Sequence, residues 1–548
     1  MKGGFTSVNK RQHLTGAQAL IASLQAFQVD TLFGIPGVHT LPIYDVLRET
    51  PGIRHILGRH EQGAGFMAEG YARVTGRPGI VSTITGPGVT NATTPMGSAF
   101  ADSIPLMVIS SGPARASVGR NRGELHEVKN QAGIMEALAG WTRCVQHVEE
   151  IPGAIQDAMR VMLQGRPRGA YLQIPLDVLR EKAYVTLPDE EDLTYTRPQP
   201  ATADIQAAAH LLREAQFPVI VAGAGVTFSG ANTELVQLAE RLQAPVILGS
   251  KSHDVLSSAH PLAILTTAYI TDELDPLLTR ADVALVIGSK LGAERTAYGR
   301  MKLPRTLIHI DIDASEFGRN YPASLGIVSD ARAALEALLP LLPEEAPARP
   351  ELPALLDEAR AAVVAHTRAY FGEGVCFLPA IREALPHDAI VVADMTMLGY
   401  ASTVSLPIYE PRTFIHPNEY CTIGCGLPLA LGAKVAAPKQ PVIALCGDAG
   451  FLLNIAEMAT AVQEQIPVIA VVFNDSTFTA VKTEQRAAYD RRYIATDVIE
   501  PDYVALAQAF RAYGTRVSTP EALRDALREA LTLNCPTVIE VQLPPKQW

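Results

Sequence analysis

The sequence is poor in cysteine and in aromatic residues. Its six cysteines are too few, over 548 residues, for a disulfide-stabilised extracellular scaffold. Cys421 and Cys425 lie close together, but no second Cys or His pair accompanies them, and a structural zinc site needs closed coordination by several ligands. Aromatic residues make up 6% of the chain, so its cores must be built mainly from aliphatic side chains.

The sequence also lacks an excess of basic residues and any long apolar run. Lys and Arg number 46 against 57 Asp and Glu, which gives a net charge of −11. This balance argues against nucleic acid and anionic membrane surfaces as partners. No apolar run reaches the roughly 20 residues of a membrane span. The opening MKGGFTSVNKRQHLTG lacks the apolar core of a secretory signal, so we expect a cytoplasmic protein.

What the sequence does have is length and aliphatic content. Hydrophobic residues make up 48% of 548 residues, which is enough for several buried cores. Two segments rich in proline and acidic residues, 187–203 and 339–353, are typical of linkers. We therefore predict three domains, at residues 10–186, 204–338 and 354–548.

Each of these parts alternates short aliphatic runs with amphipathic segments. Continuous Val, Ile and Leu runs indicate parallel strands covered on both faces, so the predicted fold class is α/β, with three doubly wound parallel-sheet domains. The first and last domains are candidates for related folds. The predicted strands are Thr31–Phe33, Ile53–Leu57, Ile80–Ile84, Leu106–Ser110, Pro218–Ala222, Pro245–Leu248, Val283–Ile287, Thr306–Ile312, Ala389–Ala393, Val442–Leu445, Val468–Phe473 and Thr537–Val541. The predicted helices of the first domain are Gly16–Gln28, Gln62–Thr75 and Asn91–Ala101.

Ligands of such sheets collect at the carboxyl ends of the strands, and two polar segments lie there in the last domain. Cys446–Gly450 follows one predicted strand, with a helical pattern from Phe451, and Asn474–Ser476 follows the next strand. Together Asp448, Asn474 and a backbone carbonyl would form a hard oxygen set that suits Mg²⁺ with phosphate oxygens. The small residues around Asp448 would let the backbone approach a diphosphate. The alternative is a turn with an aspartate cap.

In the first domain, Gly58–Gly65 follows a predicted strand and opens a helix. Glu61 would lie at the strand end, among small residues that allow close packing. From these residues alone, a helix-capping acid favoured by the helix dipole is the alternative to a functional carboxylate.

Five segments of the chain resemble one family. Arg59–Arg73, with the sequence RHEQGAGFMAEGYAR, resembles the pyrimidine-domain signature of thiamine diphosphate (ThDP) enzymes of the acetolactate synthase and 2-oxoacid decarboxylase group. Gly34–Gly37 and Thr85–Asn91 resemble two further loops, and Gly424–Pro428 resembles the loop that grips the aminopyrimidine. Gly447–Asn474 resembles the diphosphate motif, with alanine in place of its second glycine. The resemblance spans nearly the whole chain in family order.

The resemblance implies roles for individual residues. Glu61 would hydrogen-bond the pyrimidine nitrogen and promote removal of the thiazolium proton, after which the ring serves as electron sink for CO₂ loss. Ile423 takes the place of the bulky residue that holds the cofactor bent. Asp448, Asn474 and the Ser476 carbonyl would hold the metal. The residues that would contact ThDP are Pro36, Glu61, Gly86, Asn91, Ile423, Gly424, Gly447, Asp448, Ala449, Gly450, Asn474, Ser476, Thr477 and Phe478.

The family also implies an oligomer. In its members, the counterparts of Glu61 and Asp448 meet across a subunit interface. The smallest active unit would therefore be a homodimer, and we expect a homotetramer.

Two loops bear on the substrate. Asn474–Gln485 aligns without gaps with the acetolactate synthase loop, in which a tryptophan commonly stands at the position of Glu484 and a larger apolar residue at that of Ala480. Glu484 would make the pocket wall anionic, unless it lies on an exposed helix face.

In the second loop, Gly123–Gln131, Leu125 and His126 take the positions of Phe and Gln in the acetolactate synthase sequence Phe-Gln-Glu. Histidine can relay a proton near neutral pH, so His126 is a catalytic candidate with Glu61, and a surface position is the alternative. His39 is a further candidate, with a structural role as the alternative. The predicted substrate pocket comprises Val38, His39, Leu125, His126, Ala480, Val481 and Glu484.

The central domain argues against FAD. Acetolactate synthases bind FAD there through a segment that usually contains Arg-Phe-Asp-Asp-Arg, whereas this chain has Lys290–Arg295, KLGAER. The predicted cofactors are therefore ThDP and Mg²⁺.

With its acidic candidates Glu484 and Glu127 and its Leu-His-Glu loop, the chain resembles decarboxylases of 5-guanidino-2-oxopentanoate. An anionic pocket wall would suit this substrate, because a carboxylate binds a guanidinium in a two-pronged fork. We predict non-oxidative decarboxylation of a small-molecule 2-oxoacid to an aldehyde. In its specific form, the prediction is that the substrate is cationic, as 5-guanidino-2-oxopentanoate is. The first alternative is acetolactate synthase-type carboligation of 2-oxoacids. The alternative of another class is a non-catalytic regulatory member of the fold.

Overall fold

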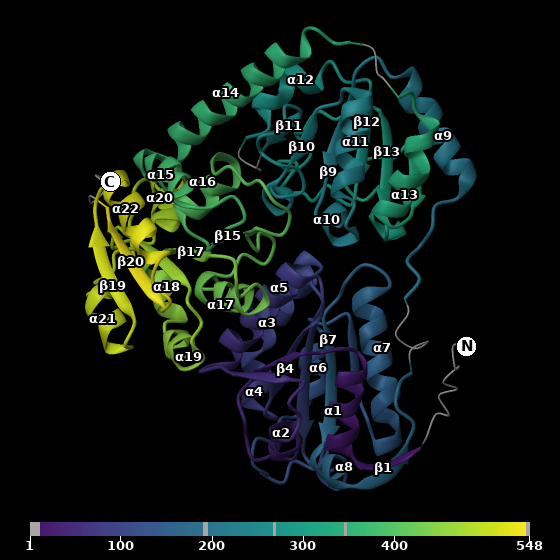
Figure 1. The fold of residues 1–548 in the computed structure, drawn as a ribbon, viewed down its shortest axis with the longest axis vertical. Helices are drawn as coiled ribbons and strands as arrows, with labels where there is room; N and C mark the ends of the chain where they lie inside the picture. The colour runs from purple at the N-terminus through teal and green to yellow at the C-terminus, as the bar shows by residue number, and fades with distance from the viewer. Residues whose placement is uncertain (1–10, 190–194, 267–269, 345–347, 544–548) are drawn as a thin grey trace, which may run out of the picture. The chain divides into compact units, whose positions relative to one another are not determined.

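The structure is a computed structural model that describes residues 11–189, 195–266, 270–344 and 348–543 (Figure 1). Parts of both predicted linkers and the C-terminal residues 544–548 lie outside the described residues. The chain forms two compact units. One comprises residues 1–196 with the short pieces 431–436 and 456–466, and the other comprises residues 197–430, 437–455 and 467–548.

Among the described residues, the main sheet of the first unit has six parallel strands in the order β3-β2-β4-β5-β7-β6. Figure 1 labels two of them, β4 and β7. The central strands β4 and β5 are buried along their whole length, as expected between helical layers. An antiparallel pair, β1 with β8, was not predicted. The strands are β1 (Gln12–Thr15), β2 (Thr31–Gly34), β3 (Arg54–Leu57), β4 (Gly79–Thr83), β5 (Leu106–Gly112), β6 (Trp141–Cys144), β7 (Ala170–Pro175) and β8 (Lys182–Val185). The helices are α1 (Gly16–Ala26), α2 (Leu41–Arg48), α3 (Glu61–Thr75), α4 (Pro87–Asn91), α5 (Thr93–Asp102), α6 (Gln131–Glu136), α7 (Ile151–Leu163) and α8 (Leu176–Arg180).

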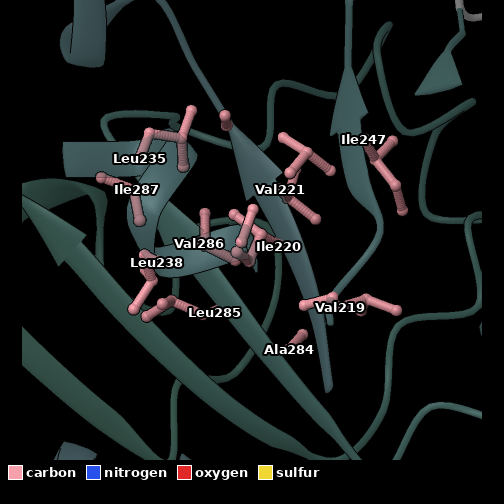
Figure 2. Close-up of a cluster of buried hydrophobic side chains, with 14 of the residues drawn as sticks. Val219, Ile220, Val221, Leu235, Leu238, Ile247, Ala284, Leu285, Val286 and Ile287 are labelled. Atoms are coloured by element: carbon pink, nitrogen blue, oxygen red, sulfur yellow. The ribbon is translucent and has the colours of Figure 1, made fainter. Parts of the chain in front are cut away.

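The central sheet has the order β11-β10-β9-β12-β13-β14, which is typical of doubly wound sheets. Figure 2 shows its aliphatic core, a cluster that contains side chains of β9, β10 and β12 together with Leu235 and Leu238 of α11. The strands are β9 (Pro218–Ala222), β10 (Val246–Leu248), β11 (Ala263–Leu265), β12 (Val283–Ile287), β13 (Thr306–Asp311) and β14 (Leu325–Val328). The helices are α9 (Thr202–Glu214), α10 (Gly225–Ser229), α11 (Asn232–Leu242), α12 (Asp275–Leu278), α13 (Ala331–Leu338) and α14 (Leu352–Phe371).

The third sheet has the order β16-β15-β17-β18-β20-β19, and all its neighbouring strands are parallel. The strands are β15 (Ile390–Ala393), β16 (Phe414–Ile415), β17 (Val442–Gly447), β18 (Ile469–Asn474), β19 (Tyr513–Val517) and β20 (Thr537–Gln542). The helices are α15 (Phe377–Ala384), α16 (Met397–Ser405), α17 (Gly426–Ala436), α18 (Asp448–Leu453), α19 (Glu457–Gln463), α20 (Thr479–Ala488), α21 (Tyr503–Ala509) and α22 (Pro520–Ala530).

The predicted fold class is confirmed, because each of the three sheets has six parallel strands covered by helices. The first and third sheets share one strand order: second, first, third, fourth, sixth and fifth along the chain. This identity supports the predicted kinship of the first and last domains. Among the described residues, no helix is both long and apolar enough to span a membrane.

Candidate active site

Glu61 begins helix α3, which a short turn, residues 58–60, connects to strand β3. Its side chain is buried, at 9% exposure, and its Oε2 accepts a hydrogen bond of 2.9 Å from Nδ2 of Asn91, the last residue of α4. A Cβ added at Gly88 would lie 3.1 Å from Oε1 of Glu61, so the α4 backbone approaches the carboxylate closely. The structure therefore brings together two of the residues predicted to contact the cofactor.

The two candidate histidines of the first unit also lie together. The ring centroids of His39 and His126 are 5.6 Å apart, and each Nδ1 atom is buried with no hydrogen-bond partner among the described residues. Burial, and then the nearby charge of His126, lowers the pKa of His39. Gly86 has a φ of +69°, and a Cβ there would lie 2.4 Å from the His126 carbonyl oxygen. Glycine at this position thus lets two predicted loops meet.

Val38 and Leu125 flank these histidines along the chain. Their side chains are exposed, at 53% and 61%. Pro36 is likewise exposed in the loop after β2. These three predicted residues therefore lie on the surface of the first unit.

In the second unit, Asp448 is the first residue of α18 and is 4% exposed. Its Oδ1 accepts from the Ala449 N–H at 2.7 Å, and its Oδ2 accepts from the N–H groups of Ser476 at 2.7 Å and Asp475 at 3.1 Å. Burial raises the pKa of Asp448 to about 6. Helix α18 begins at Asp448, three residues before Phe451, where the sequence pattern predicted its start.

Asn474 completes this cluster. Its Nδ2 donates to Oε1 of Glu540 at 2.9 Å, which fixes the amide orientation, and its Oδ1 accepts from the Ser476 N–H at 3.1 Å. Since both Asp448 and Asn474 bond the Ser476 N–H, the three predicted metal-binding residues come together. The result is a group of oxygen atoms at the carboxyl ends of β17 and β18.

The loop before α17 carries Ile423 and Gly424. Gly424 has a φ of +87°; its N–H donates to Oδ1 of Asp394 at 3.0 Å, and its carbonyl accepts from Asn454 Nδ2 at 2.7 Å. Asp394 is 1% exposed and also accepts from the Met395 N–H at 2.7 Å. No role was predicted for Asp394, although its place directly after β15 was a signal.

A cavity of about 720 Å³ in the second unit joins several of these elements. Its walls include aromatic and aliphatic side chains such as Phe371, Phe377 and Leu398. Glu484 is absent from the lining and is exposed on α20, so its place in the pocket stays a prediction. The predicted residues that line the cavity are Ile423, Gly447, Asp448, Ala449, Gly450, Thr477, Phe478, Ala480 and Val481.

Three family models match the chain in order. They describe the N-terminal binding domain, the central domain and the C-terminal binding domain of thiamine pyrophosphate enzymes, and they match residues 14–134, 205–338 and 394–541. Thiamine pyrophosphate is another name for ThDP. This chain belongs to the ThDP enzyme family.

The relatives of this ThDP enzyme include a probable decarboxylase and several acetolactate synthases. It is 37% identical to the probable 2-ketoarginine decarboxylase AruI of Pseudomonas aeruginosa, over 94% of this chain and 91% of that protein. It is 31% identical to an acetolactate synthase of Mycobacterium bovis, over 96% of this chain and 88% of that protein. The large subunit of acetolactate synthase isozyme 3 of Escherichia coli is also 31% identical, over 94% and 92%.

The residues present in this ThDP enzyme fit its cofactor. A Cβ at Gly450 would lie 3.3 Å from Asp394 Oδ2 and 3.3 Å from Ile423 Cγ1, so glycine lets the start of α18 pack closely against the segment that carries Ile423. Gly450 and Ile423 both line the cavity. The oxygens of Asp448 and Asn474 would fill only part of the coordination sphere of Mg²⁺. This fits the cofactor, because Mg²⁺ usually takes its other ligands from phosphate oxygens and water. Among the described residues, no group of three or more His, Cys, Asp or Glu side chains could hold a metal by itself.

Sequence reasoning assigned no role to Gln131, which holds the Gly86 loop. Gln131 Oε1 accepts from Thr85 Oγ1 and from the Gly86 N–H, both at 2.6 Å. Its Nε2 donates to the Tyr171 hydroxyl at 2.9 Å and to the Ser111 carbonyl at 3.0 Å. A buried amide with partners on two strands, β5 and β7, keeps this loop in one conformation.

In the central domain of this ThDP enzyme, the Arg295 side chain lies at the end of strand β10. Arg295 donates from Nη2 to the Ile247 carbonyl at 3.1 Å and from Nη1 to Ser252 Oγ at 3.2 Å. A Cβ at Gly249 would lie 2.7 Å from Arg295 Nη1. Arg295 belongs to the segment that replaces the FAD-binding pattern, which supports the prediction against FAD.

We expect the purified protein to carry no flavin. The Arg295 guanidinium occupies space beside the β10 end, and a dinucleotide would have to displace it. The check is the absorption spectrum of the native protein and of the supernatant after heat denaturation, with free FAD as standard. About one flavin per chain would contradict the prediction.

Proposed function

We propose that this ThDP enzyme catalyses the Mg²⁺-dependent, non-oxidative decarboxylation of 5-guanidino-2-oxopentanoate (2-ketoarginine) to the corresponding aldehyde. The observation that carries the proposal is the 37% identity, over 94% of this chain, to a probable 2-ketoarginine decarboxylase. The acetolactate synthases compared above reach 31%. The absence of their FAD pattern at Lys290–Arg295 points the same way.

Glu61 is the proposed proton carrier of the reaction. The buried carboxylate is oriented by Asn91 at 2.9 Å, and it would exchange a proton with the pyrimidine ring. When bound, ThDP supplies an electron sink for the bond that CO₂ leaves. Because Glu61 and Asn91 belong to different helices, their contact holds the carboxylate in one place.

Asp448, Asn474 and the Ser476 carbonyl are the proposed magnesium ligands. Glu540 fixes the Asn474 amide, so Oδ1 faces the same cluster as the Asp448 carboxylate. Mg²⁺ held there would neutralise the cofactor's phosphate oxygens. The small residues Gly447, Ala449 and Gly450 belong to the same proposed cofactor site.

His126, with His39 beside it, is the proposed donor of the proton that replaces CO₂ on the substrate carbon. Decarboxylation breaks one carbon–carbon bond, and the electron pair of that bond must take up a proton before the aldehyde leaves. The 5.6 Å separation of the two rings supports a shared role in moving this proton. Val38 and Leu125 stay predicted pocket residues.

Ala480, Val481 and Glu484 are the proposed walls of the substrate pocket in the second unit. The first two line the cavity, and Asp475 adds a carboxylate to the lining. An anionic side of the cavity suits a guanidinium, which binds carboxylates in a two-pronged fork. Glu484 would join it if α20 turns toward the substrate.

The assembly belongs to the proposal. We expect domains at residues 10–186, 204–338 and 354–548, a homodimer as the minimal active unit and a homotetramer in solution. In this dimer, Glu61 of one protomer would act with Asp448 of the partner subunit. We also expect the enzyme to be cytoplasmic. Sedimentation velocity of the purified, cofactor-loaded enzyme tests the oligomeric state.

A panel of 2-oxoacids assayed for CO₂ release with ThDP and Mg²⁺ tests the substrate. We expect 5-guanidino-2-oxopentanoate to exceed pyruvate in kcat/KM by at least about 10-fold, because one charge-assisted pair contributes on the order of 1.5–3 kcal/mol. An uncharged 2-oxoacid of similar length is the matched control. Faster turnover of pyruvate would contradict the proposal.

The second candidate function is acetolactate-type carboligation, which the acetolactate synthase relatives favour. In that case the activated carbon attacks a second 2-oxoacid instead of a proton. Product analysis with pyruvate separates the two functions: acetaldehyde supports decarboxylation, and acetolactate supports carboligation.

A further inference from the structure

Glu457, the first residue of α19, is a fully buried carboxylate in the first unit. Its side chain is 0% exposed. It lies within the segment Gly447–Asn474 that resembles the diphosphate motif, but no role was predicted for it. A buried carboxylate is costly unless hydrogen bonds compensate for the lost water. Its partners therefore indicate why the chain places it there.

These partners are the backbone groups that lead into helix α3. Glu457 Oε1 accepts from the N–H groups of His60 at 3.0 Å and Arg59 at 3.1 Å, and Oε2 lies 3.2 Å from the Arg59 nitrogen. Thr460 Oγ1 lies 2.7 Å from Glu457 Oε2 and 2.9 Å from the Leu57 carbonyl oxygen. One residue pair of α19 thus bonds the backbone on both sides of Gly58, between β3 and α3.

The arrangement resembles a capping box completed from another helix. In a capping box, the side chain of the third helical residue bonds the N–H of the N-cap residue. Here His60 is the N-cap residue and Gly63 is the third helical residue, which has no side chain. A Cβ at Gly63 would lie 2.2 Å from Glu457 Oε1. Glu457 therefore occupies the space that a capping side chain at residue 63 would fill. It also accepts the hydrogen bond from the His60 N–H that such a side chain would accept.

This contact bears on Glu61, the first residue of the same helix. A carboxylate in the first turn is attracted to the free N–H groups at its own helix start. Because Glu457 already bonds the N–H of His60, Glu61 is left to bond Asn91. We propose that Glu457 is a positioning residue that holds the β3–α3 turn so that the Glu61 carboxylate lies against Asn91. This inference rests on the proposed role of Glu61.

The test compares three variants with a matched control. Glu457→Ala removes the bonds, Glu457→Gln keeps an oxygen for the two N–H groups, and Glu457→Asp withdraws the carboxylate by one methylene. The control is Glu69→Ala, because Glu69 is equally buried, belongs to α3 and bonds Arg73 rather than the turn.

The first measurement uses the protein without cofactor. We expect amide hydrogen exchange at Arg59 and His60 to be at least about 10-fold faster in Glu457→Ala than in wild type, because each loses its acceptor. Glu457→Gln and Glu69→Ala should stay near wild type at these two amides. Unchanged exchange in Glu457→Ala would overturn the proposal.

The second measurement is the exchange rate of the thiazolium proton of bound ThDP, without substrate. We expect at least about 10-fold slower exchange in Glu457→Ala, since a misplaced catalytic group costs on this order or more. Glu457→Gln should restore the rate to within about threefold of wild type on the same grounds. If Glu457→Ala does not fold, Glu457→Asp should show the same change, smaller in size.

The outcomes separate positioning from simple stability. Faster amide exchange with a thiazolium rate within about twofold of wild type, well inside the effect expected of a positioning group, would mean that Glu457 only stabilises the fold, and would overturn the proposal. The Glu61→Gln variant, measured in the same way, tests the proposed role of Glu61 separately from that of Glu457. If that variant matches wild type in thiazolium exchange, the role of Glu61 is wrong, and the positioning role of Glu457 falls with it.

Discussion

Replacing Glu61 with Gln is expected to lower kcat by at least about 100-fold, the usual contribution of a general acid or base. The amide keeps the size of the side chain and an oxygen that can accept from Asn91, now 2.9 Å from the carboxylate. It cannot exchange a proton with the pyrimidine ring. The measurement is CO₂ release at saturating ThDP, Mg²⁺ and 2-oxoacid.

The matched control for this prediction is Glu49→Gln. Glu49 is exposed and pairs with Arg48, also exposed, so the same chemical change occurs away from the proposed site. We expect it to leave turnover and melting temperature unchanged. If Glu61→Gln stayed within threefold of wild type, far less than a general acid or base contributes, the proposed proton path would be wrong. A non-catalytic role for the whole chain would instead show as no turnover in wild type.

Most of the strands could be predicted because they are aliphatic and buried on both faces. The predicted strands Pro218–Ala222 and Val283–Ile287 match β9 and β12 at both ends. The strands that were not predicted are β1, β6, β7, β8, β11, β14, β16 and β19. In β1 and β8, each of four residues, most side chains are exposed or only partly buried, whereas β7 is buried along its whole length. A short strand at the surface lacks the hydrophobic pattern that identifies a core strand.

Helix boundaries were harder to predict where a turn interrupts a regular pattern. The predicted helix Asn91–Ala101 is divided between α4, which ends at Asn91, and α5, which begins at Thr93. Helix α14 was assigned to the third domain from residue 354. Its residues Leu356 and Val363 pack in the central hydrophobic core. In the sequence, the linker rich in proline and acidic residues before this helix was the signal for the boundary, which stays a prediction.

The residues of the candidate site divide in the same way. Asp448 and Asn474 could be predicted because each lies at the carboxyl end of a strand of one sheet, so the topology alone brings them together. Asp394 also directly follows a strand, β15, and this signal was missed. Gln131 and Glu457 could not be predicted, because their partners are mainly backbone or distant polar groups. Their function depends on packing, for which a single sequence has no pattern.

Replacing Asp448 with Asn is expected to raise the Mg²⁺ concentration needed for half-maximal activity by at least about 10-fold, because even indirect changes around a metal ligand cost 10–100-fold in affinity. The amide is neutral, and its NH₂ group would face N–H donors. The carboxylate now accepts from Ala449, Asp475 and Ser476, so one of these contacts would become repulsive. The measurement is CO₂ release by the metal-free protein at saturating ThDP as Mg²⁺ is added, which gives the Mg²⁺ concentration for half-maximal activity.

Asp525→Asn is the control for this change, since Asp525 is exposed on α22 and pairs with Arg524. It should keep the wild-type Mg²⁺ requirement. Dialysis of the wild-type enzyme against EDTA should abolish CO₂ release, and added Mg²⁺ should restore it. Because Asp448 combines the proposed metal site with the bonds that order residues 475 and 476, its replacement should also slow ThDP binding at saturating Mg²⁺. An unchanged Mg²⁺ requirement in Asp448→Asn would place the metal elsewhere.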